Sequence, residues 1–367
     1  MQRISGLGGS ERHLLTLLPA LGEAGIDVSL LLFASGEVPE ARSAFADSGI
    51  DITWERAGAD IGVGMLRAIR SEFAHRRPDL LHTHLVHADL HGRMVARMAG
   101  VPIVSSAHSV HSFFGREPVR STYRATRRWI SANIAISDHV ARFLIDHRLA
   151  TPDSISVVPY GIEAHRWHAP ERGATLRASV GVADGSLVVG VASRLIAGKG
   201  HALLLAALAE IPPTDPPKVL LVAGDGPLRS SLEHQAERLG LDVRFLGFVA
   251  DMPAFMNASD IVVFPTQPEL GEGFGLAALE AMAAGRPVIA SAIASLPEVV
   301  LDRTTGLLVA SGSSKELAKA VEFLASDPSV RQGYGRAASI RAANEFSLEP
   351  MAQSTIGIYR EVLTSSR

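Results

Sequence analysis

Short runs of β-branched residues and leucine alternate with helix-period patterns along the chain. In the first half these runs cover residues 27–33, 80–84, 102–108 and 133–137, and a shorter one at 155–163 leads into a Pro/Gly turn. The pattern then restarts at 187–193, 218–224, 243–247, 261–265 and 287–291. Such alternation is typical of βαβ units and parallel sheets. We therefore predict an α/β protein with two Rossmann-like, doubly wound domains.

The break near residue 160 suggests where the domains divide. A length of 367 residues fits two domains, at a prior of roughly 150 residues each. We predict an N-terminal domain at 1–160, a C-terminal domain at 161–345, and a helical segment at 346–367 that packs back towards the N-terminal domain. Ligands of such sheets bind beyond the carboxyl ends of the strands, so we expect the site in the cleft that the two domains face.

Composition narrows the classes of function. Hydrophobic residues make up 47%, charged residues 20%, and the net charge is -3, which gives no overall attraction to nucleic acid. Cysteine is absent, and this excludes disulfides, thiolate nucleophiles and cysteine zinc sites. We find neither a run of 18 apolar residues nor a signal-peptide pattern, so the expectation is a cytoplasmic protein.

The N-terminal sequence GLGGSERHLLTLLPALGEAG is a glycine-rich loop followed by an amphipathic helix. Amides at such a helix start attract phosphate. The loop is not a dinucleotide fingerprint, because the third glycine of G-x-G-x-x-G would fall at Glu11. Taken alone, it is equally compatible with a tight turn that caps a helix.

A second loop, RLIAGKG, follows the strand at 187–193 and carries Arg194 and Lys199. Two cations at the carboxyl edge of a parallel sheet suit a diphosphate, since Arg grips two oxygens and Lys supplies a mobile charge. The spacing excludes a P-loop. A solvated charge pair is the alternative interpretation.

The sequence EGFGLAALEAMAAG places Glu272 just before an apolar helix and Glu280 within it. A buried carboxylate needs a partner, and ribose hydroxyls are suitable ones. Eight residues of helix would span about 12 Å, too far for the carboxylate pair of a retaining glycosidase at about 5 Å. The amides of Gly273, Phe274 and Gly275 would form a helix start able to hold phosphate.

Together these motifs resemble the retaining glycosyltransferases of the GT-B fold, specifically family four, also called glycosyl transferases group 1. The resemblance covers nearly the whole chain. Its most specific part is E-x7-E, from Glu272 to Glu280, and GGSE (8–11), SRLIAGKG (193–200), AGDGPL (223–228) and ASDIVVFPT (258–266) occur in the family's order. Two departures stand out: only MQRIS precedes Gly6, so the first strand is shortened, and TQPELGEGFG is longer than in the shortest members.

The resemblance implies a role for each matching residue. Arg194 and Lys199 would hold the donor diphosphate, Glu280 the ribose and Glu272 the sugar hydroxyls. The amides of Gly273, Phe274, Gly275 and Leu276 would contact sugar and phosphate. The loop 247–249, ending at Val249, would pass the base, and Gly9 would approach the diphosphate from the other domain.

Two sets of histidines are further candidates for function. His108 ends the strand at 102–108, where the family places a histidine against the transferring sugar. His82, His84, His87 and His91 form a denser cluster, but carboxylate or thiolate support for a metal is not evident. The resemblance implies no metal, and the D-x-D motif of the GT-A fold is absent.

The predicted activity is metal-independent transfer of a sugar from a nucleoside diphosphate sugar, with retention. The donor is a co-substrate, so no cofactor is expected. The catalytic group would comprise His108, Glu272, Arg194 and Lys199. Two alternatives remain: a nucleotide-sugar epimerase on this fold and a non-catalytic two-domain sugar-binding protein.

The acceptor is suggested by one basic stretch. Arg116, Arg120, Arg124, Arg127 and Arg128 would share a helix face, with Glu117 among them. Such a face would attract an anionic membrane or a lipid-linked, phosphorylated or saccharide acceptor, and would place the enzyme peripherally at the inner membrane face. A solvated helix surface is the alternative.

Overall fold

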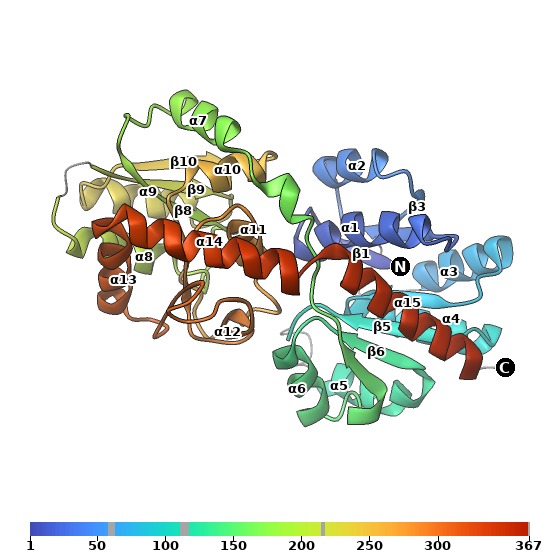
Figure 1. The fold of residues 1–367 in the computed structure, drawn as a ribbon. Coiled ribbons are helices and arrows are strands. Elements are labelled where there is room, and N and C mark those ends of the chain that lie inside the picture. The colour runs from blue at the N-terminus through green and yellow to red at the C-terminus, as the bar shows by residue number, and fades with distance from the viewer. Residues whose placement is uncertain (58–62, 111–116, 214–216, 366–367) are drawn as a thin grey trace. The chain divides into compact units, whose positions relative to one another are not determined.

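The computed structural model describes residues 1–57, 63–110, 117–213 and 217–365. The chain forms two compact units (Figure 1). Unit 1 comprises Met1–Gly161 and Leu348–Arg367, and unit 2 comprises Ile162–Ser347. The chain therefore leaves unit 1 once and returns to it with its last helix.

Unit 1 is built on a seven-stranded sheet whose paired strands all run parallel. The spatial order is β3 (Asp51–Arg56), β2 (Ser29–Ala34), β1 (Gln2–Ile4), β4 (Leu81–His84), β5 (Ile103–Ala107), β6 (Ala132–Ala135) and β7 (Ile155–Val157). The order reverses between β1 and β4, which is the switch point where doubly wound sheets bind ligands.

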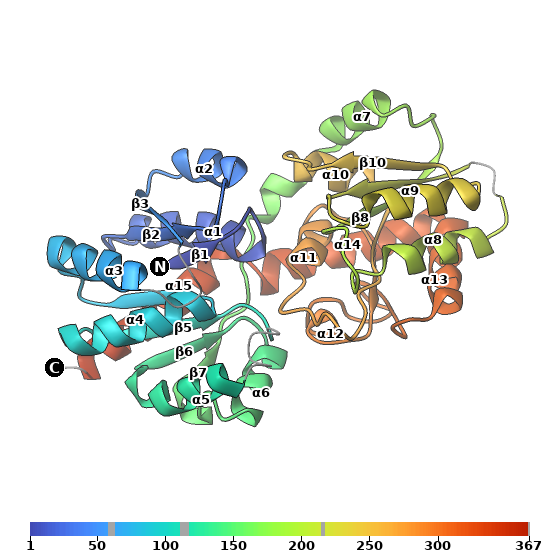
Figure 2. The same ribbon diagram turned by 180° about the vertical axis from the view of Figure 1, so that it is seen from behind.

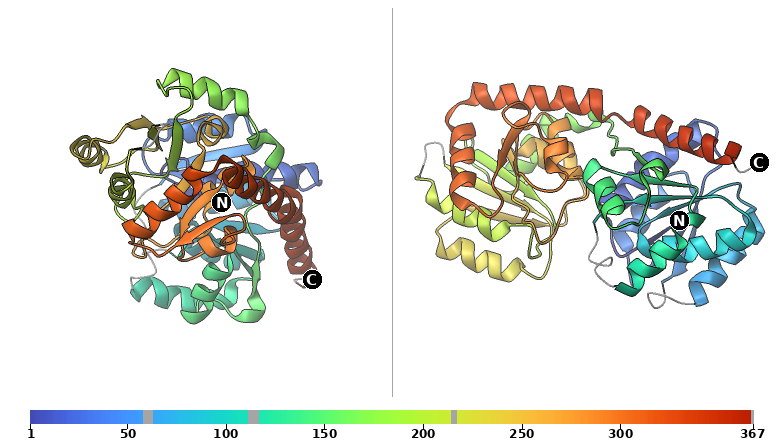
Figure 3. Two further views of the ribbon diagram at one scale, coloured as in Figure 1. Left: turned by 60° about the vertical axis from the view of Figure 1, so that its left-hand side comes forward. Right: turned by 90° about the horizontal axis from the view of Figure 1, so that it is seen from below.

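Helices cover both faces of this sheet (Figure 2). They are α1 (Gly9–Glu23), α2 (Pro39–Ala46), α3 (Val63–Arg76), α4 (Val86–Ala99), α5 (Glu117–Thr126), α6 (Asp138–Asp146) and α15 (Leu348–Ser365), with short 3-10 turns at Arg127–Trp129 and Pro152–Ser154. One core joins leucines of α1 and β2 to Met351 and Ile356 of α15. The other lies under α3 and α4, around Phe33 and Ile69. Figure 3 shows α15 extending along unit 1, where it packs on α1.

Unit 2 has a six-stranded sheet, whose paired strands again run parallel. The order is β10 (Val243–Gly247), β9 (Lys218–Ala223), β8 (Leu187–Ala192), β11 (Ile261–Phe264), β12 (Val288–Ser291) and β13 (Gly306–Val309). Every residue of β8 is buried, as expected of a strand covered on both faces.

The helices of unit 2 surround this sheet and close its core. They are α7 (Pro170–Ser179), α8 (His201–Glu210), α9 (Arg229–Arg238), α10 (Met252–Ala258), α11 (Leu276–Ala283), α12 (Leu296–Val299), α13 (Ser314–Ser326) and α14 (Pro328–Glu345), with a 3-10 turn at Ala164–Trp167. Two parallel sheets with helices confirm the predicted fold class.

The sequence pattern missed β3 and β13, whereas the shortened first strand that it predicted is present as β1. β1 has three residues, and β3 is an edge strand whose residues are half-buried or exposed. β13 is a four-residue strand at one edge of the unit 2 sheet. Short or edge strands lack the long apolar run by which central strands are recognised. Within the described residues, no helix is long and apolar enough to cross a membrane.

Candidate functional site

The loop between β8 and α8 carries the two predicted phosphate-binding cations. Arg194 is exposed and Lys199 is half-buried. The loop ends at Gly200, which caps α8 with φ +76°. A Cβ there would lie 1.9 Å from the carbonyl oxygen of Pro265. Only glycine allows this approach, which fixes the end of the loop against the segment that follows β11.

The AGDGPL motif shapes the same loop from its other side. Cβ atoms on Gly224 and Gly226 would lie 2.1 Å from the Ser193 oxygen and 2.5 Å from the Leu195 oxygen. The amide of Leu195 also donates to the carbonyl oxygen of Asp225 at 2.9 Å. These glycines therefore let the β9 turn pack against the backbone that presents Arg194.

The second acidic motif lies around the start of α11. Gly275 is the N-cap, in the left-handed region at φ +90°, and α11 begins at Leu276. Gly273, Phe274 and Gly275 are buried before it, and Glu280 is 4% exposed within the helix. Glu272 lies outside the helix, as expected from the sequence. Helix α11 ends at Ala283, so Glu272 lies in the connection between β11 and α11 and Glu280 lies in the helix that follows it.

Lys199 and Glu272 meet directly, a contact that the sequence did not predict. Lys199 Nζ donates to Glu272 Oε2 at 2.6 Å, with the side chains 17% and 23% exposed. The buried Ser295 donates its hydroxyl to the Glu272 carbonyl oxygen at 2.8 Å. The loop that carries Arg194 and Lys199 is thus in contact with the segment that carries Glu272 in unit 2.

The predicted base loop follows β10. Gly247 is at φ +67°, and its carbonyl oxygen accepts from the Gly224 amide at 2.7 Å. Val249 is half-buried two residues later, whereas Phe248 is 52% exposed. The loop is therefore tied to the AGDGPL turn and, through it, to the loop of Arg194.

In unit 1, the glycine loop leads into α1, whose first residue is Gly9. The helix start has an acidic cap from its own first turn, because the Gly8 amide donates to Glu11 Oε2 at 2.9 Å. Gln2 donates to the other carboxylate oxygen at 2.6 Å. Burial raises the pKa of Glu11, and these hydrogen bonds act against that rise. Gly9 itself is exposed.

His108 lies directly after β5, at the carboxyl edge of the sheet, and is buried. Its Nε2 is 2.8 Å from His84 Nδ1 and its Nδ1 is 2.6 Å from the Tyr160 hydroxyl. His13 of α1 stacks on Tyr160 with ring centroids 4.6 Å apart. Sequence reasoning missed Tyr160 and His13, because residues so far apart in the chain carry no common spacing.

The four histidines singled out by density separate in the structure. His82 and His84 lie on β4, and His87 and His91 on α4. His91 Nδ1 contacts the backbone oxygen of His87 at 2.8 Å. Among the described residues, no group of three or more His, Asp or Glu side chains could hold a metal ion.

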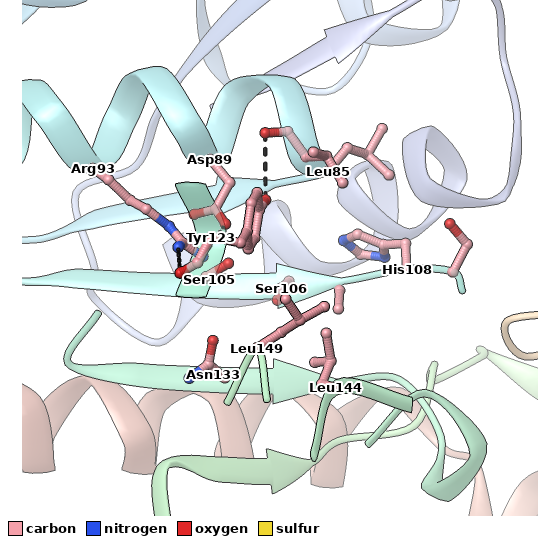
Figure 4. A pocket seen from close by; sticks show the side chains of 13 residues that line it. Leu85, Asp89, Arg93, Ser105, Ser106, His108, Tyr123, Asn133, Leu144 and Leu149 are labelled. Atoms are coloured by element: carbon pink, nitrogen blue, oxygen red, sulfur yellow. Dashed lines mark hydrogen bonds and ion pairs between the residues drawn. The ribbon is translucent and has the colours of Figure 1, made fainter. Parts of the chain in front are cut away.

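A small cavity of about 30 Å³ runs behind His108. His108 lies towards one end and the Arg93–Asp89 pair towards the other (Figure 4). That ion pair is 2.7 Å long, with both side chains 2% exposed, and Arg93 stacks on Tyr123 at 3.9 Å. Since one water needs roughly 10–15 Å³, the cavity has room for about two waters and none for a sugar ring.

The structure forms only part of the predicted basic face. Arg116 lies outside the described residues. α5 ends at Thr126, so Arg127 and Arg128 fall in the following 3-10 turn rather than on the same helix. Glu117 pairs with both Arg120 and Arg124, and Arg124 Nε donates to the His147 carbonyl oxygen at 3.0 Å. Arg128 is exposed.

Two family models match the chain in succession. Residues 7–166 match the model described as Glycosyltransferase Family 4, and residues 174–341 match Glycosyl transferases group 1. Gly9, His108, Arg194, Lys199, Glu272 and Glu280 lie within these two ranges.

Individual relatives agree with these matches. A D-inositol 3-phosphate glycosyltransferase of Saccharomonospora viridis is 32% identical over 79% of this chain and 71% of its own. A glycogen synthase of Mycobacterium tuberculosis is 30% identical over 96% and 91%. The crystal structure of Anabaena Alr3699/HepE with UDP and glucose superposes with a TM-score of 0.84, at 24% identity, over 98% of this chain and 100% of that one. This likeness confirms the GT-B fold.

Proposed function

The chain belongs to glycosyltransferase family four, the glycosyl transferases of group 1, and from that premise we propose which of its residues perform the family's reaction and what acceptor it takes. The protein is a retaining glycosyltransferase that moves a sugar from a nucleoside diphosphate sugar to an acceptor, without a metal. The family match supports transfer over the epimerase and sugar-binding alternatives.

The site in unit 2 is proposed to hold the donor. Arg194 and Lys199 bind the diphosphate, with the amides of Gly273, Phe274 and Gly275 at the start of α11. The ion pair of Lys199 with Glu272 supports this assignment, because it brings the phosphate-binding cation and the sugar-binding carboxylate within 2.6 Å. Fixed donors of this kind stabilise the charge that develops on the leaving group.

The remaining donor contacts are proposed for residues of both units. Glu280 accepts hydrogen bonds from the ribose hydroxyls, and the backbone at Leu276 and Val249 contacts the donor sugar and the base. From unit 1, Gly9 approaches the diphosphate and His108 the transferring sugar. These roles rest on the family resemblance and on the position of each residue at the carboxyl edge of its sheet.

The proposed chemistry is attack on the same face from which the diphosphate leaves. The bond between the anomeric carbon and the phosphate oxygen breaks, and the acceptor oxygen forms its bond on that face. The acceptor proton passes to the departing phosphate oxygen. No enzyme nucleophile is used, so retention needs no covalent intermediate.

A measurement of the turnover rate and of the anomeric configuration of the product tests the activity and the site together. Wild type, with a donor panel and excess chelator, should release nucleoside diphosphate and form a product that keeps the donor's anomeric configuration. Arg194→Met should lower kcat by at least about a hundredfold, given the usual size of transition-state charge stabilisation. Arg303→Met, an exposed arginine of the same unit, is the control. Equal rates for both variants would refute the donor site.

For the acceptor we propose an anionic molecule, a phosphorylated polyol or a lipid-linked phosphate, bound by unit 1. The support is the arginine-rich segment at Arg120–Arg128, of which Arg127 and Arg128 are exposed, and the inositol phosphate named for several relatives. The glycogen synthase among the relatives favours a saccharide instead, so the acceptor class needs its own test.

That test compares soluble and membrane acceptors at two salt concentrations. Initial rates with inositol phosphate and with inositol, and sedimentation with anionic and neutral vesicles, are measured for wild type and for an Arg120→Gln, Arg124→Gln, Arg127→Gln variant. An anionic acceptor predicts a rate or binding that falls with salt and with the triple substitution. Equal behaviour of both proteins towards every probe would favour a neutral saccharide.

A further inference from the structure

Both ring nitrogens of His108 are engaged within unit 1. Nδ1 lies 2.6 Å from the Tyr160 hydroxyl and Nε2 lies 2.8 Å from His84 Nδ1. The ring is 8% exposed, so it is held at two opposite points. A neutral imidazole has one N–H donor and one acceptor nitrogen, and the partners therefore determine which nitrogen carries the proton.

The length of the contact with Tyr160 indicates the direction of donation. N–H···O bonds in proteins usually measure about 2.7–3.2 Å and O–H···O bonds about 2.5–3.0 Å, so bonds to oxygen are shorter when a hydroxyl is the donor. A separation of 2.6 Å thus fits donation by the phenol to Nδ1. The proton of His108 is then on Nε2, from which it is donated to His84 Nδ1.

Burial supports a neutral ring. It lowers the pKa of His108 well below its ordinary value, and the neighbouring His13 and His82 lower it further. Burial also lowers the pKa of His84, with His82 and His108 adding to the effect. Because neither ring is charged near neutral pH, the tautomer decides whether His108 offers a donor or an acceptor.

We propose that Tyr160 is a positioning residue, which sets the tautomer of His108 so that its Nε2–H is the group offered to the transferring sugar. This rests on the proposed function, in which His108 contacts that sugar. An oxygen of the sugar takes the place of His84 Nδ1 as the acceptor. His84 holds the Nε2 proton until then and so keeps the ring in its working orientation.

The neighbouring strand supplies a matched control. His82 Nδ1 is 2.6 Å from the Tyr359 hydroxyl, and His82 Nε2 is 2.7 Å from Ser106 Oγ. The same tyrosine–histidine contact therefore occurs twice, but only Tyr160 contacts His108. Removal of either hydroxyl leaves a phenyl ring in place, and the ring of Tyr160 can keep its stacking on His13.

The tautomer is measured directly by long-range 1H–15N NMR of the full chain with labelled histidine. The His108 signals are assigned by their loss in His108→Gln. Wild type and Tyr359→Phe should show the proton of His108 on Nε2, whereas Tyr160→Phe should show Nδ1–H or a mixture. A proton on Nδ1 in wild type, or no change in Tyr160→Phe, would overturn the proposal.

Kinetics then tests the consequence for the reaction. Loss of one neutral hydrogen bond changes an equilibrium by about three- to tenfold, so kcat of Tyr160→Phe should fall by about that factor, with an unchanged KM for the donor. Tyr359→Phe should match wild type. An altered tautomer with an undiminished kcat would overturn the positioning role. If His108→Ala itself retains full kcat, it is the proposed sugar contact that fails, and the NMR result still decides the tautomer.

Discussion

Lys199 Nζ and Glu272 Oε2 form an ion pair of 2.6 Å, although the two residues are 73 positions apart and belong to different motifs. One motif was expected at the diphosphate and the other at the sugar. Each side chain is the other's partner. A donor must therefore separate or share this pair, since the same cation is proposed to receive the diphosphate.

This relationship predicts opposite effects of one substitution on two ligands. Glu272→Gln leaves Lys199 without its competing anion, so free nucleoside diphosphate should bind about fivefold more tightly, the value of a modest ion pair. Turnover of the complete donor should fall, because the carboxylate that accepts sugar hydroxyls is lost. Calorimetry and initial rates measure the two effects. Glu171→Gln, on the exposed part of α7, is the control, and weaker diphosphate binding by Glu272→Gln would contradict the competition.

Glu280 should behave differently from Glu272. Its carboxylate lies within α11 and is proposed to accept the ribose hydroxyls. Hydrogen bonds to charged groups contribute about 1.5–3 kcal/mol, so Glu280→Gln should weaken nucleoside diphosphate binding by about ten- to a hundredfold. Inorganic diphosphate, which lacks ribose, should bind wild type and Glu280→Gln equally. If Glu280→Gln leaves nucleotide affinity unchanged while Glu272→Gln abolishes it, the two roles are reversed.

The sequence indicated which elements carry the proposed donor-site residues better than it indicated the surroundings of His108, for a physical reason. Arg194, Lys199 and Glu272 occur in loops that follow strands, Glu280 lies in the helix after one of these loops, and parallel strands bring their carboxyl ends to one edge. Their order along the chain therefore predicted that they lie near the same edge of the unit 2 sheet. It did not reveal the Lys199–Glu272 pair, which depends on how two loops fold over each other.

Around His108 the contacts come from remote parts of unit 1. Tyr160 follows β7 and His13 lies on α1, so no motif spacing connects them to β5.

For the basic stretch, the sequence predicted a feature that the structure forms only in part. Its spacing predicted one helical face, but α5 ends at Thr126 and Glu117 pairs with two of the arginines, which charge counting along a helix cannot foresee.

Substitutions at two glycines of unit 2 distinguish the cost of a left-handed backbone from the effect of a displaced loop on the site. Gly200 and Gly185 have similar φ values, +76° and +79°, but a Cβ on Gly185 meets nothing within 4 Å. Gly185→Ala should cost about 1–2 kcal/mol for the left-handed conformation alone. Gly200→Ala should cost more, because its Cβ would lie 1.9 Å from the Pro265 oxygen.

The readouts are the midpoint of thermal unfolding and the affinity for nucleoside diphosphate. At about 2–4 °C per kcal/mol for a domain of this size, Gly185→Ala should lose a few degrees and keep its affinity. Gly200→Ala should lose more and also bind the diphosphate more weakly, since the loop of Lys199 must move. Equal affinity in the two variants would show that this loop does not depend on the close approach.

The buried histidines of unit 1 predict how stability depends on pH. Burial lowers the pKa of His13 to about 3 and that of His82, His84 and His108 well below the ordinary value. Below pH 6.5 or so, the unfolded chain binds protons that the folded chain does not. The free energy of unfolding should therefore be greatest above that pH and fall as the pH is lowered towards the folded-state pKa values.

Each such histidine contributes a slope of up to about 1.4 kcal/mol per pH unit, which makes one substitution measurable. His13→Phe removes one of these groups while a ring remains to stack on Tyr160. Between pH 6 and pH 4, its free energy of unfolding in urea should fall less steeply than that of wild type by about that amount. His234→Phe is the control, because His234 is exposed and its removal takes away no buried neutral ring. Identical slopes for wild type and His13→Phe would mean that His13 takes up its proton in the folded protein as readily as in the unfolded chain.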